Sequence, residues 1–401
     1  MVDLRSARRG VAIVFFVYGA VLATWVSRIP LIKQELELDT AQLSLALLGS
    51  PVGLILAMQA VAALVGRWTS AVVTRVALVG ACVAVVLPGV AWSLGSLAAA
   101  LLLLGFSLGS LDIAMNTQGV AVERGYARPV MSGIHAMYSV GVLAGAGVGA
   151  LAASAEVDPL AHFVVAAAVL AILGLLGART LLGAAADQPA EAEDADRPAL
   201  RLSQHPALIA LGFVAFCCLF AEGAVDDWSG VYLREEQGAS LGVAALGAAA
   251  AGAGMAIGRF GGDAVIARFG RPATLWWSSL VAGAGMTLAV LAPAPGVAIA
   301  AYFVLGLGVA TIVPIAFTLA GTHPGVPPAW AISRVTTLGY AGLFASPPMV
   351  GLVAQATSLT TALAIPAVLL LLVAPLSRAG SPGRRAGRTY TRSRRRGTGG
   401  T

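Results

Sequence analysis

Long apolar runs alternate with short polar breaks along most of the chain. A helix needs about 20 apolar residues to cross a bilayer. Runs of that length predict twelve membrane-spanning helices at 9–28, 41–65, 73–93, 96–121, 129–153, 159–182, 206–228, 241–266, 273–292, 297–320, 329–351 and 358–377. The breaks after the third and the ninth run are very short. If one of these breaks does not separate two helices, the chain has eleven spans. The pattern predicts an all-α polytopic membrane protein.

The composition of the chain supports a lipid environment. Hydrophobic residues make up 58% of its 401 residues and charged residues only 11%, whereas a soluble domain carries about 25% charged residues. The three cysteines, Cys82, Cys217 and Cys218, fall inside apolar runs without the spacing of a metal site or a disulfide framework. The spans contain no nucleophile–base pair, metal cluster or phosphate loop, and the chain has only four histidines. We therefore expect neither an enzyme nor a cofactor.

The basic residues predict the orientation of the chain. Cytoplasmic loops of membrane proteins carry an excess of Lys and Arg. With the N-terminus inside, the cytoplasmic side holds nearly all of the 25 basic residues, and the exceptions are Arg28, Lys33 and Arg234. This places both termini in the cytoplasm and the chain in the cytoplasmic (inner) membrane. Since the net charge of +6 then serves membrane insertion, we expect no nucleic-acid partner.

A polar, acidic and proline-containing segment at 184–204 divides the spans into two sets of six. It predicts an N-terminal six-helix bundle at 1–183, a cytoplasmic linker, and a C-terminal six-helix bundle at 205–377. Matching residues recur in the two halves at nearly constant offsets of about 201 to 203: Gly105 with Gly306, Gly141 with Gly342, and Trp25 with Trp228. Such internal similarity indicates two pseudo-symmetric bundles. The Gly/Arg-rich tail at 378–401 is predicted to be disordered and to contact anionic lipid.

A loop motif follows the eighth span. The segment GRFGGDAVIARFGR contributes Gly258, Arg259, Gly262, Asp263, Arg268, Gly270 and Arg271. The glycines allow close approach of helices, and Asp263 can pair with arginines at the cytoplasmic face. We interpret the motif as a cytoplasmic gate that stabilises one closed state and opens during a transport cycle. Charge that only sets topology is the alternative.

Ionisable groups inside the bilayer are costly, and this makes them functional candidates. Asp112 lies well within the fourth span, and Asn116 follows one helical turn later. They share a stripe with glycines above and below, which suits a helix lining a water-filled cavity. Glu222 and Asp226 in the seventh span are also one turn apart. We expect Asp112 and Glu222 to couple protons and Asn116 and Asp226 to bind solute; for Asp112, a purely structural interhelical hydrogen bond is the alternative.

Two further groups are candidates. In the fifth span, His135 and Ser139 share a face, and because histidine titrates near neutral pH, His135 is a candidate proton relay and Ser139 a candidate solute contact. Toward the outer side, Trp25 and Arg28 of the first span correspond to Trp228 of the seventh. Indole rings beside a cation would bind a sugar ring or a carboxylated solute. Packing is the alternative for His135, and interfacial anchoring is the alternative for the tryptophans.

With these motifs the chain resembles the YbjJ-type inner-membrane permeases of the major facilitator superfamily, which are related to fucose-permease-like sugar:proton symporters. The resemblance rests on five segments: WVSRIP (25–30), LDIAMNTQGVAVER (111–124), SGIHAMYSVG (132–141), AEGAVDDWS (221–229) and GRFGGD (258–263). It implies a solute site between the halves near the bilayer centre, alternating access, and proton coupling by the acid of the fourth span, Asp112. The first span has no carboxylate to match the second coupling acid of those symporters.

These features favour a secondary active transporter that moves a small polar solute by proton symport. We expect it to work as a monomer in the lipid bilayer, with the solute and protons as its other partners. A proton-coupled exporter of drugs or metabolites would use the same acids, but the fifth span lacks the proline of an antiporter motif, which favours uptake. A membrane receptor that binds a ligand without flux is a third hypothesis.

Overall fold

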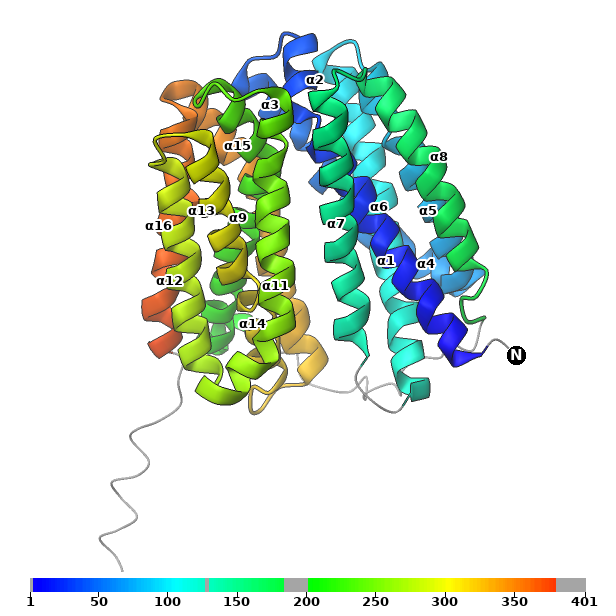
Figure 1. Ribbon diagram of the computed structural model, residues 1–401. Helices are drawn as coiled ribbons and strands as arrows, with labels where there is room; N and C mark the ends of the chain where they lie inside the picture. Colours follow the sequence, from blue (N-terminus) through cyan, green and yellow to red (C-terminus); the bar gives the residue numbers. More distant parts are fainter. Residues whose placement is uncertain (1–2, 127–129, 184–200, 380–401) are drawn as a thin grey trace, which may run out of the picture.

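The computed structural model consists of long helices in two groups that stand side by side (Figure 1). It describes residues 3–126, 130–183 and 201–379, and that part of the chain contains no β-strand. The all-α prediction is therefore confirmed. Most of the predicted linker at 184–204 and of the predicted tail at 378–401 lies outside the described residues.

The helices of the two groups follow each other along the chain. The first group comprises α1 (Leu4–Val26), α2 (Ile29–Glu35), α3 (Thr40–Leu47), α4 (Gly49–Trp68), α5 (Ser70–Ala84), the 3₁₀ helix η1 (Leu87–Val90), α6 (Leu94–Tyr126), α7 (Met131–Ser154) and α8 (Pro159–Ala178). The second comprises the 3₁₀ helix η3 (Leu202–Gln204), α9 (Pro206–Glu235), α10 (Leu241–Ala244), α11 (Leu246–Phe269), α12 (Arg271–Val290), α13 (Pro295–Val309), α14 (Ile312–Gly321), α15 (Pro328–Ala356) and α16 (Leu359–Ala379).

Twelve helical segments of the described residues are long and apolar enough to cross a membrane. Each overlaps one of the apolar runs, so the predicted count is confirmed. The short break after the ninth span is real, since α12 ends at Val290 and α13 begins at Pro295. The first span is longer than predicted and extends from Leu4 to Glu35, because the chain turns at residues 27–28 and continues at once as α2.

The two groups are built alike. In the first, α1 packs along α7 and α4 packs along α6; in the second, α9 packs along α15 and α11 along α13. These are corresponding pairs of spans, the first with the fifth and the second with the fourth. The pseudo-symmetry predicted from the repeat is therefore confirmed as an equivalence of helix contacts.

Glycines make the closest of these contacts possible. A Cβ atom at Gly105 would collide with the backbone of Ser50 on α4, and one at Gly306 would collide with the backbone of Ala251 on α11. Both contacted residues differ in number by 201, the offset of the glycines themselves. Small residues at such crossings let helix backbones approach closely in lipid, where packing replaces the hydrophobic effect between helices.

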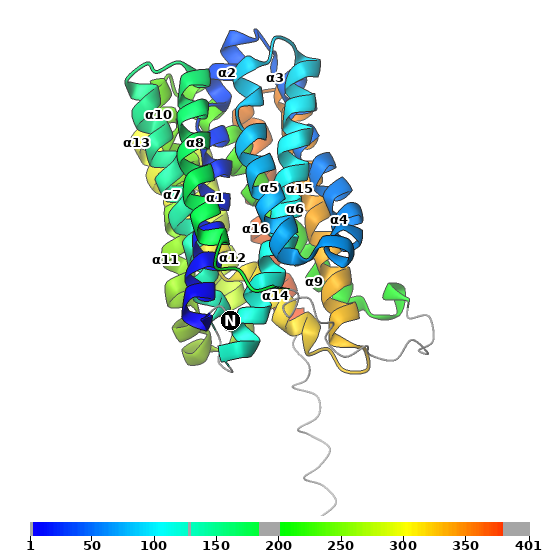
Figure 2. The same ribbon diagram turned by 90° about the vertical axis from the view of Figure 1, so that its right-hand side faces the viewer.

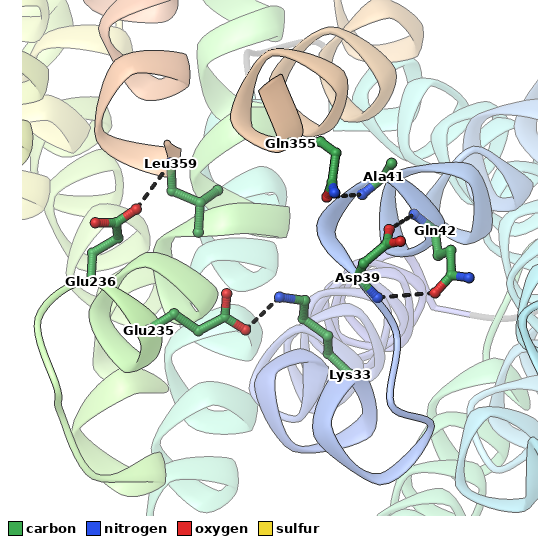
Figure 3. A network of polar contacts seen from close by, with 8 residues as sticks. All are labelled: Lys33, Asp39, Ala41, Gln42, Glu235, Glu236, Gln355 and Leu359. Carbon is green, nitrogen blue, oxygen red and sulfur yellow. Dashed lines mark hydrogen bonds and ion pairs between the residues drawn. The ribbon is translucent and has the colours of Figure 1, made fainter. Parts of the chain in front are cut away.

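The two groups meet at the end of the bundle opposite the N-terminus, which we call the closed end. There α2 and α3 lean across toward the second group (Figures 1 and 2). Lys33 forms an ion pair with Glu235, and the amide of Ala41 donates to Oε1 of Gln355 at 3.4 Å (Figure 3). α15 packs against α3 but barely touches α4, which continues the same span toward the N-terminal end. The halves therefore diverge from the closed end toward the N-terminal end.

Candidate functional site

A cavity lies between the two groups, below the closed end. It is lined by α1, α7, α9, α11 and α13, and its polar lining consists of Ser27, Tyr138, Ser139, Glu222 and Asp226. Its empty space is about 680 Å³, a volume that includes open solvent. The structure thus brings Ser139 of the first group and Glu222 and Asp226 of the second to one cavity.

Asp112 and Asn116 lie on α6, and neither lines this cavity, contrary to the expectation from the stripe; Asp112 is partly buried. Nδ2 of Asn116 donates to Oδ1 of Asp112 at 3.1 Å and to its backbone carbonyl at 2.8 Å. Asp112 also interacts electrostatically with Tyr18 of α1 and Tyr340 of α15. The predicted pair of acid and amide therefore forms, and it faces helices of both groups.

Other residues of α6 have structural roles. Gly105 and Gly109 pack against α4 and do not line the cavity. Oε2 of Glu123 accepts from the backbone amides of Val130 and Met131 at 2.7 and 2.9 Å. These bonds stabilise the start of α7, because the first amides of a helix have no partner within it.

Glu222 and Asp226 share one face of α9, as their spacing predicts. The thiol of Cys218, one turn earlier, lies 3.5 Å from Oε1 of Glu222. Glu222 also interacts electrostatically with Arg259 of α11, and Asp226 interacts with Glu222. The second group therefore places two carboxyls and one guanidinium beside the cavity.

Arg259 of the loop motif contacts the other group, and its role in a cytoplasmic gate stays a prediction. Its Nη1 donates to Oγ of Ser139, on α7 of the other group, at 3.4 Å. Ala248, Gly252 and Met255 of α11 line the cavity, and Arg259 continues the same helix face by one turn. Arg259 itself is not among the residues that line the cavity, but it lies one helical turn after Met255, which is.

The rest of the motif lies where the sequence placed it, at the N-terminal end. Gly258 packs closely on α13, and Gly262 lies close to Thr311. Asp263 is exposed, and among the described residues no ion pair joins it to an arginine. The remaining members flank the loop: Arg268 lies over the ring of Phe269, and Gly270 and Arg271 begin α12. The proposed latch is not formed in this conformation and stays a prediction for the opposite state.

His135 lies one turn before Ser139 on α7 and contacts the ring of Phe15 edge-on, with 4.8 Å between centroids. It interacts electrostatically with Arg259. The histidine is therefore close to the charged groups, although it does not line the cavity. Its role as a proton relay stays a prediction.

Trp25, Arg28 and Trp228 do not form an open platform. The two tryptophans expose 4% and 0% of their surfaces, and Arg28 exposes 1%. Nε of Arg28 donates to Nδ1 of His162 at 3.1 Å, and its Nη2 donates to the carbonyl of Val157 at 3.0 Å. The turn that ends α1 directs this side chain into its own group, away from the cavity. Solute contacts by these three residues therefore have no support in this conformation.

Three tyrosines lie near these charged groups, and the sequence analysis missed them; of the three, Tyr138 lines the cavity. The rings of Tyr18 and Tyr138 lie 5.7 Å apart across α1 and α7. Tyr138 interacts electrostatically with Asp226, Glu222, Arg259 and Asp112, and Tyr340 interacts with Asp112 and Glu222. A phenol deep within a span needs a polar partner, and that was the available signal. Phenolic hydroxyls beside carboxyls can hold hydroxyl groups of a polar solute.

Comparisons with known proteins agree with this architecture. A family model described as Major Facilitator Superfamily matches residues 124–330. An uncharacterized MFS-type transporter of Yersinia pestis is 34% identical over 91% of this chain and 93% of its own length. A variant of the nucleoside transporter NupG has a similar structure, with a TM-score of 0.76 at 12% identity over 93% of this chain and 99% of that one. The transporter FucP in its outward conformation has a TM-score of 0.61 at 18% identity, covering 94% and 99% of the two chains.

Proposed function

Because the chain belongs to the Major Facilitator Superfamily, whose members carry out membrane transport, we propose that it moves a small polar solute across the cytoplasmic membrane by proton-coupled symport. One observation carries the proposal: partly buried carboxyls of both halves, Asp112 and Glu222, lie around Tyr340 in the region between the two bundles, which the pairing of Lys33 with Glu235 closes at one end. Such a region opens to one side at a time when the bundles rock against each other.

The orientation follows from the basic residues. Cytoplasmic loops collect arginines, which supports an orientation with the N-terminal end inside and the closed end outside. In this proposal the structure is the inward-facing state. The pairing of Lys33 with Glu235 closes the outer side, and the site would exchange solute with the cytoplasm.

Protons enter the proposal through the carboxyls. A carboxyl that is buried in the bilayer is most stable either protonated or paired, so it changes state as the cavity alternates between the two sides. Asp112 is the main candidate because Asn116 holds it in place and it faces helices of both halves. The contact of Glu222 with Arg259 makes it the second candidate.

Proteoliposomes loaded with a pH-sensitive dye would test the function. Sugars, organic acids and drugs are added in turn, and a transported solute is expected to acidify the lumen as it enters. Asp112→Asn should abolish proton-driven accumulation while solute counterflow persists, because exchange needs no net proton movement. The matched control is Glu37→Gln, which changes an exposed carboxylate outside the spans.

Three results would contradict the proposal. Unchanged proton-driven accumulation in Asp112→Asn excludes coupling through this acid. Solute efflux driven by an inward proton gradient would identify an exporter. Solute binding without counterflow in the wild-type chain would identify a receptor.

A further inference from the structure

Arg259 is a cation placed inside the membrane without a matching anion in contact. It lies within the span Leu241–Phe269 and is partly buried. Among the described residues, its guanidinium bonds only to the neutral hydroxyl of Ser139, at 3.4 Å, and no carboxylate forms an ion pair with it. A cation in this position is costly unless it has a function. Its donors are directed across the gap between the halves.

One of the groups around Arg259, the carboxyl of Glu222, can compete with a bound anion for its guanidinium. Glu222 interacts electrostatically with Arg259 without reaching ion-pair distance. The titratable groups that face Glu222 are Cys218 and Asp226 on α9, Arg259 on α11, Tyr138 on α7 and Tyr340 on α15. Arg259 is the only cation among them, so an ionised Glu222 and an incoming anion would compete for one guanidinium.

We propose that Arg259 binds the carboxylate of the transported solute, which makes the substrate a small hydroxylated carboxylic acid. A guanidinium recognises a carboxylate through two parallel N–H···O bonds. The hydroxyls of Tyr18, Tyr138 and Tyr340 and the pair of Asp112 with Asn116 offer neutral and polar partners for the solute's hydroxyl groups. The inference rests on the proposed function and deepens it by naming the substrate class.

Competition explains how a proton at Glu222, the second coupling acid beside Asp112, accompanies the anion. When Glu222 takes up a proton from water, its carboxylate becomes a neutral acid and no longer attracts Arg259. The solute carboxylate then takes the guanidinium, and one proton and one negative charge enter together. When the solute leaves on the other side, Glu222 releases its proton there and interacts with Arg259 again. Binding of the anion should therefore strengthen as the pH falls.

The test uses three solutes with one carbon skeleton: D-gluconate, D-glucose and D-glucosamine, which carry a carboxylate, no charge and an ammonium group. Their binding to the purified full-length chain is measured by calorimetry and thermal shift at about pH 6 and about pH 8. Gluconate is expected to bind best, and Arg259→Gln should weaken its binding by roughly tenfold or more. Arg259→Lys should retain part of the binding, since it keeps the charge but loses the planar fork.

Glu222→Gln separates the proposal from a purely structural role of Arg259. This variant mimics the protonated acid, so it should bind gluconate at about pH 8 as tightly as the wild type does at about pH 6. The wild type should gain up to about tenfold per pH unit, the limit for uptake of one proton. Arg334→Gln, which removes an exposed cation above the ring of Trp330, is the matched control and should bind like the wild type.

Several outcomes would overturn the inference. These are preferential binding of glucose or glucosamine, no binding of gluconate, unchanged gluconate binding in Arg259→Gln, and an unchanged pH dependence in Glu222→Gln. The proposed function fails separately. If gluconate binds through Arg259 but gives neither counterflow nor proton entry, the inferred ligand class is correct and the proposed transport is wrong. If glucose is transported with protons, the proposed transport is correct and the inferred substrate class is wrong.

Discussion

The two halves of the molecule share their packing and differ in their charges. Gly105 and Gly306 meet equivalent backbone positions on α4 and α11, so the same crossing occurs twice. The embedded charges are not repeated: the first half holds Asp112 with a neutral amide partner, whereas the second holds Glu222 and Asp226 with a guanidinium at hand. The two halves therefore share the same helix packing but carry different polar groups within their spans.

The difference indicates that the repeated packing and the unequal charges serve separate functions. A transporter that rocks needs two bundles that move as units, and close helix packing provides this in lipid. It needs only one set of groups that binds and releases its cargo. We therefore expect substitutions at the repeated glycines to affect stability in both halves alike, and substitutions at the charged groups to act unequally.

The largest expected effect tests the repeated packing. Gly105→Ala and Gly306→Ala each place a methyl group against backbone atoms that cannot rotate away. Each should destabilise the protein by about 2 kcal/mol or more, the upper range for overpacking. Thermal unfolding in detergent, followed by size-exclusion chromatography, measures the loss. Similar losses in the two variants are expected because the crossings are equivalent.

The controls are two glycines within long helices at positions where an added methyl group would meet no neighbouring atom. A Cβ atom at Gly147 of α7 or Gly261 of α11 would meet no atom within 4 Å. Alanine there should stabilise its helix by about 0.5–1 kcal/mol. A large loss in only one of Gly105→Ala and Gly306→Ala would contradict the equivalence of the halves.

A smaller effect is expected at the closed end, where the two halves contribute unequal partners. Lys33 exposes 7% of its side chain and Glu235 exposes 35%. Glu235→Gln leaves a buried ammonium without its anion, whereas Lys33→Met leaves a carboxylate that water can reach. Glu235→Gln should therefore open the closed end more, shifting the balance between the two states by about tenfold, or about 1.4 kcal/mol.

The shift can be measured by labelling Ser27→Cys, in the cavity lining, with a maleimide that does not cross the membrane. Added from the outer side, it should react faster in Glu235→Gln than in Lys33→Met. The double exchange Lys33→Glu with Glu235→Lys should slow the reaction again because it restores the pair. Equal labelling in all variants would show that the ion pair does not keep this end closed.

The sequence predicted the scaffold well because the bilayer imposes a simple rule on it. A run of about 20 apolar residues can only be a span, so the count of twelve and the two-bundle repeat followed from length and offset. The first span was cut short at residue 28, since its charged extension through Lys33 looks like a loop. That lysine is tolerated because Glu235, distant in sequence, pairs with it.

The site was predicted only in part, because contacts across the two halves are not encoded locally. Asp112, Asn116 and Glu222 stood out as polar residues in apolar runs, and their partners or neighbours agree with that interpretation. Arg259 was assigned to the loop motif that begins beside it, and its position opposite Ser139 depends on how α11 meets α7. Arg28 shows the reverse case: the sequence placed it with a solute, but the turn after α1 directs it to His162.

The smallest expected effect concerns the turn that joins the second span to the third and its counterpart in the second half. Thr69 has φ 83° and ψ 149°, and Gly270, 201 residues later, has φ 77° and ψ 157°. This conformation is essentially restricted to glycine and costs other residues about 1–3 kcal/mol. Thr69→Gly should therefore stabilise the protein by about 1 kcal/mol, and Gly270→Ala should destabilise it by a similar or larger amount. Thr322→Gly, at a helix end with φ −102°, is the matched control and should lower stability by about 0.5–1 kcal/mol. If thermal unfolding showed Thr69→Gly to be as harmful as Thr322→Gly, the two turns would not be equivalent.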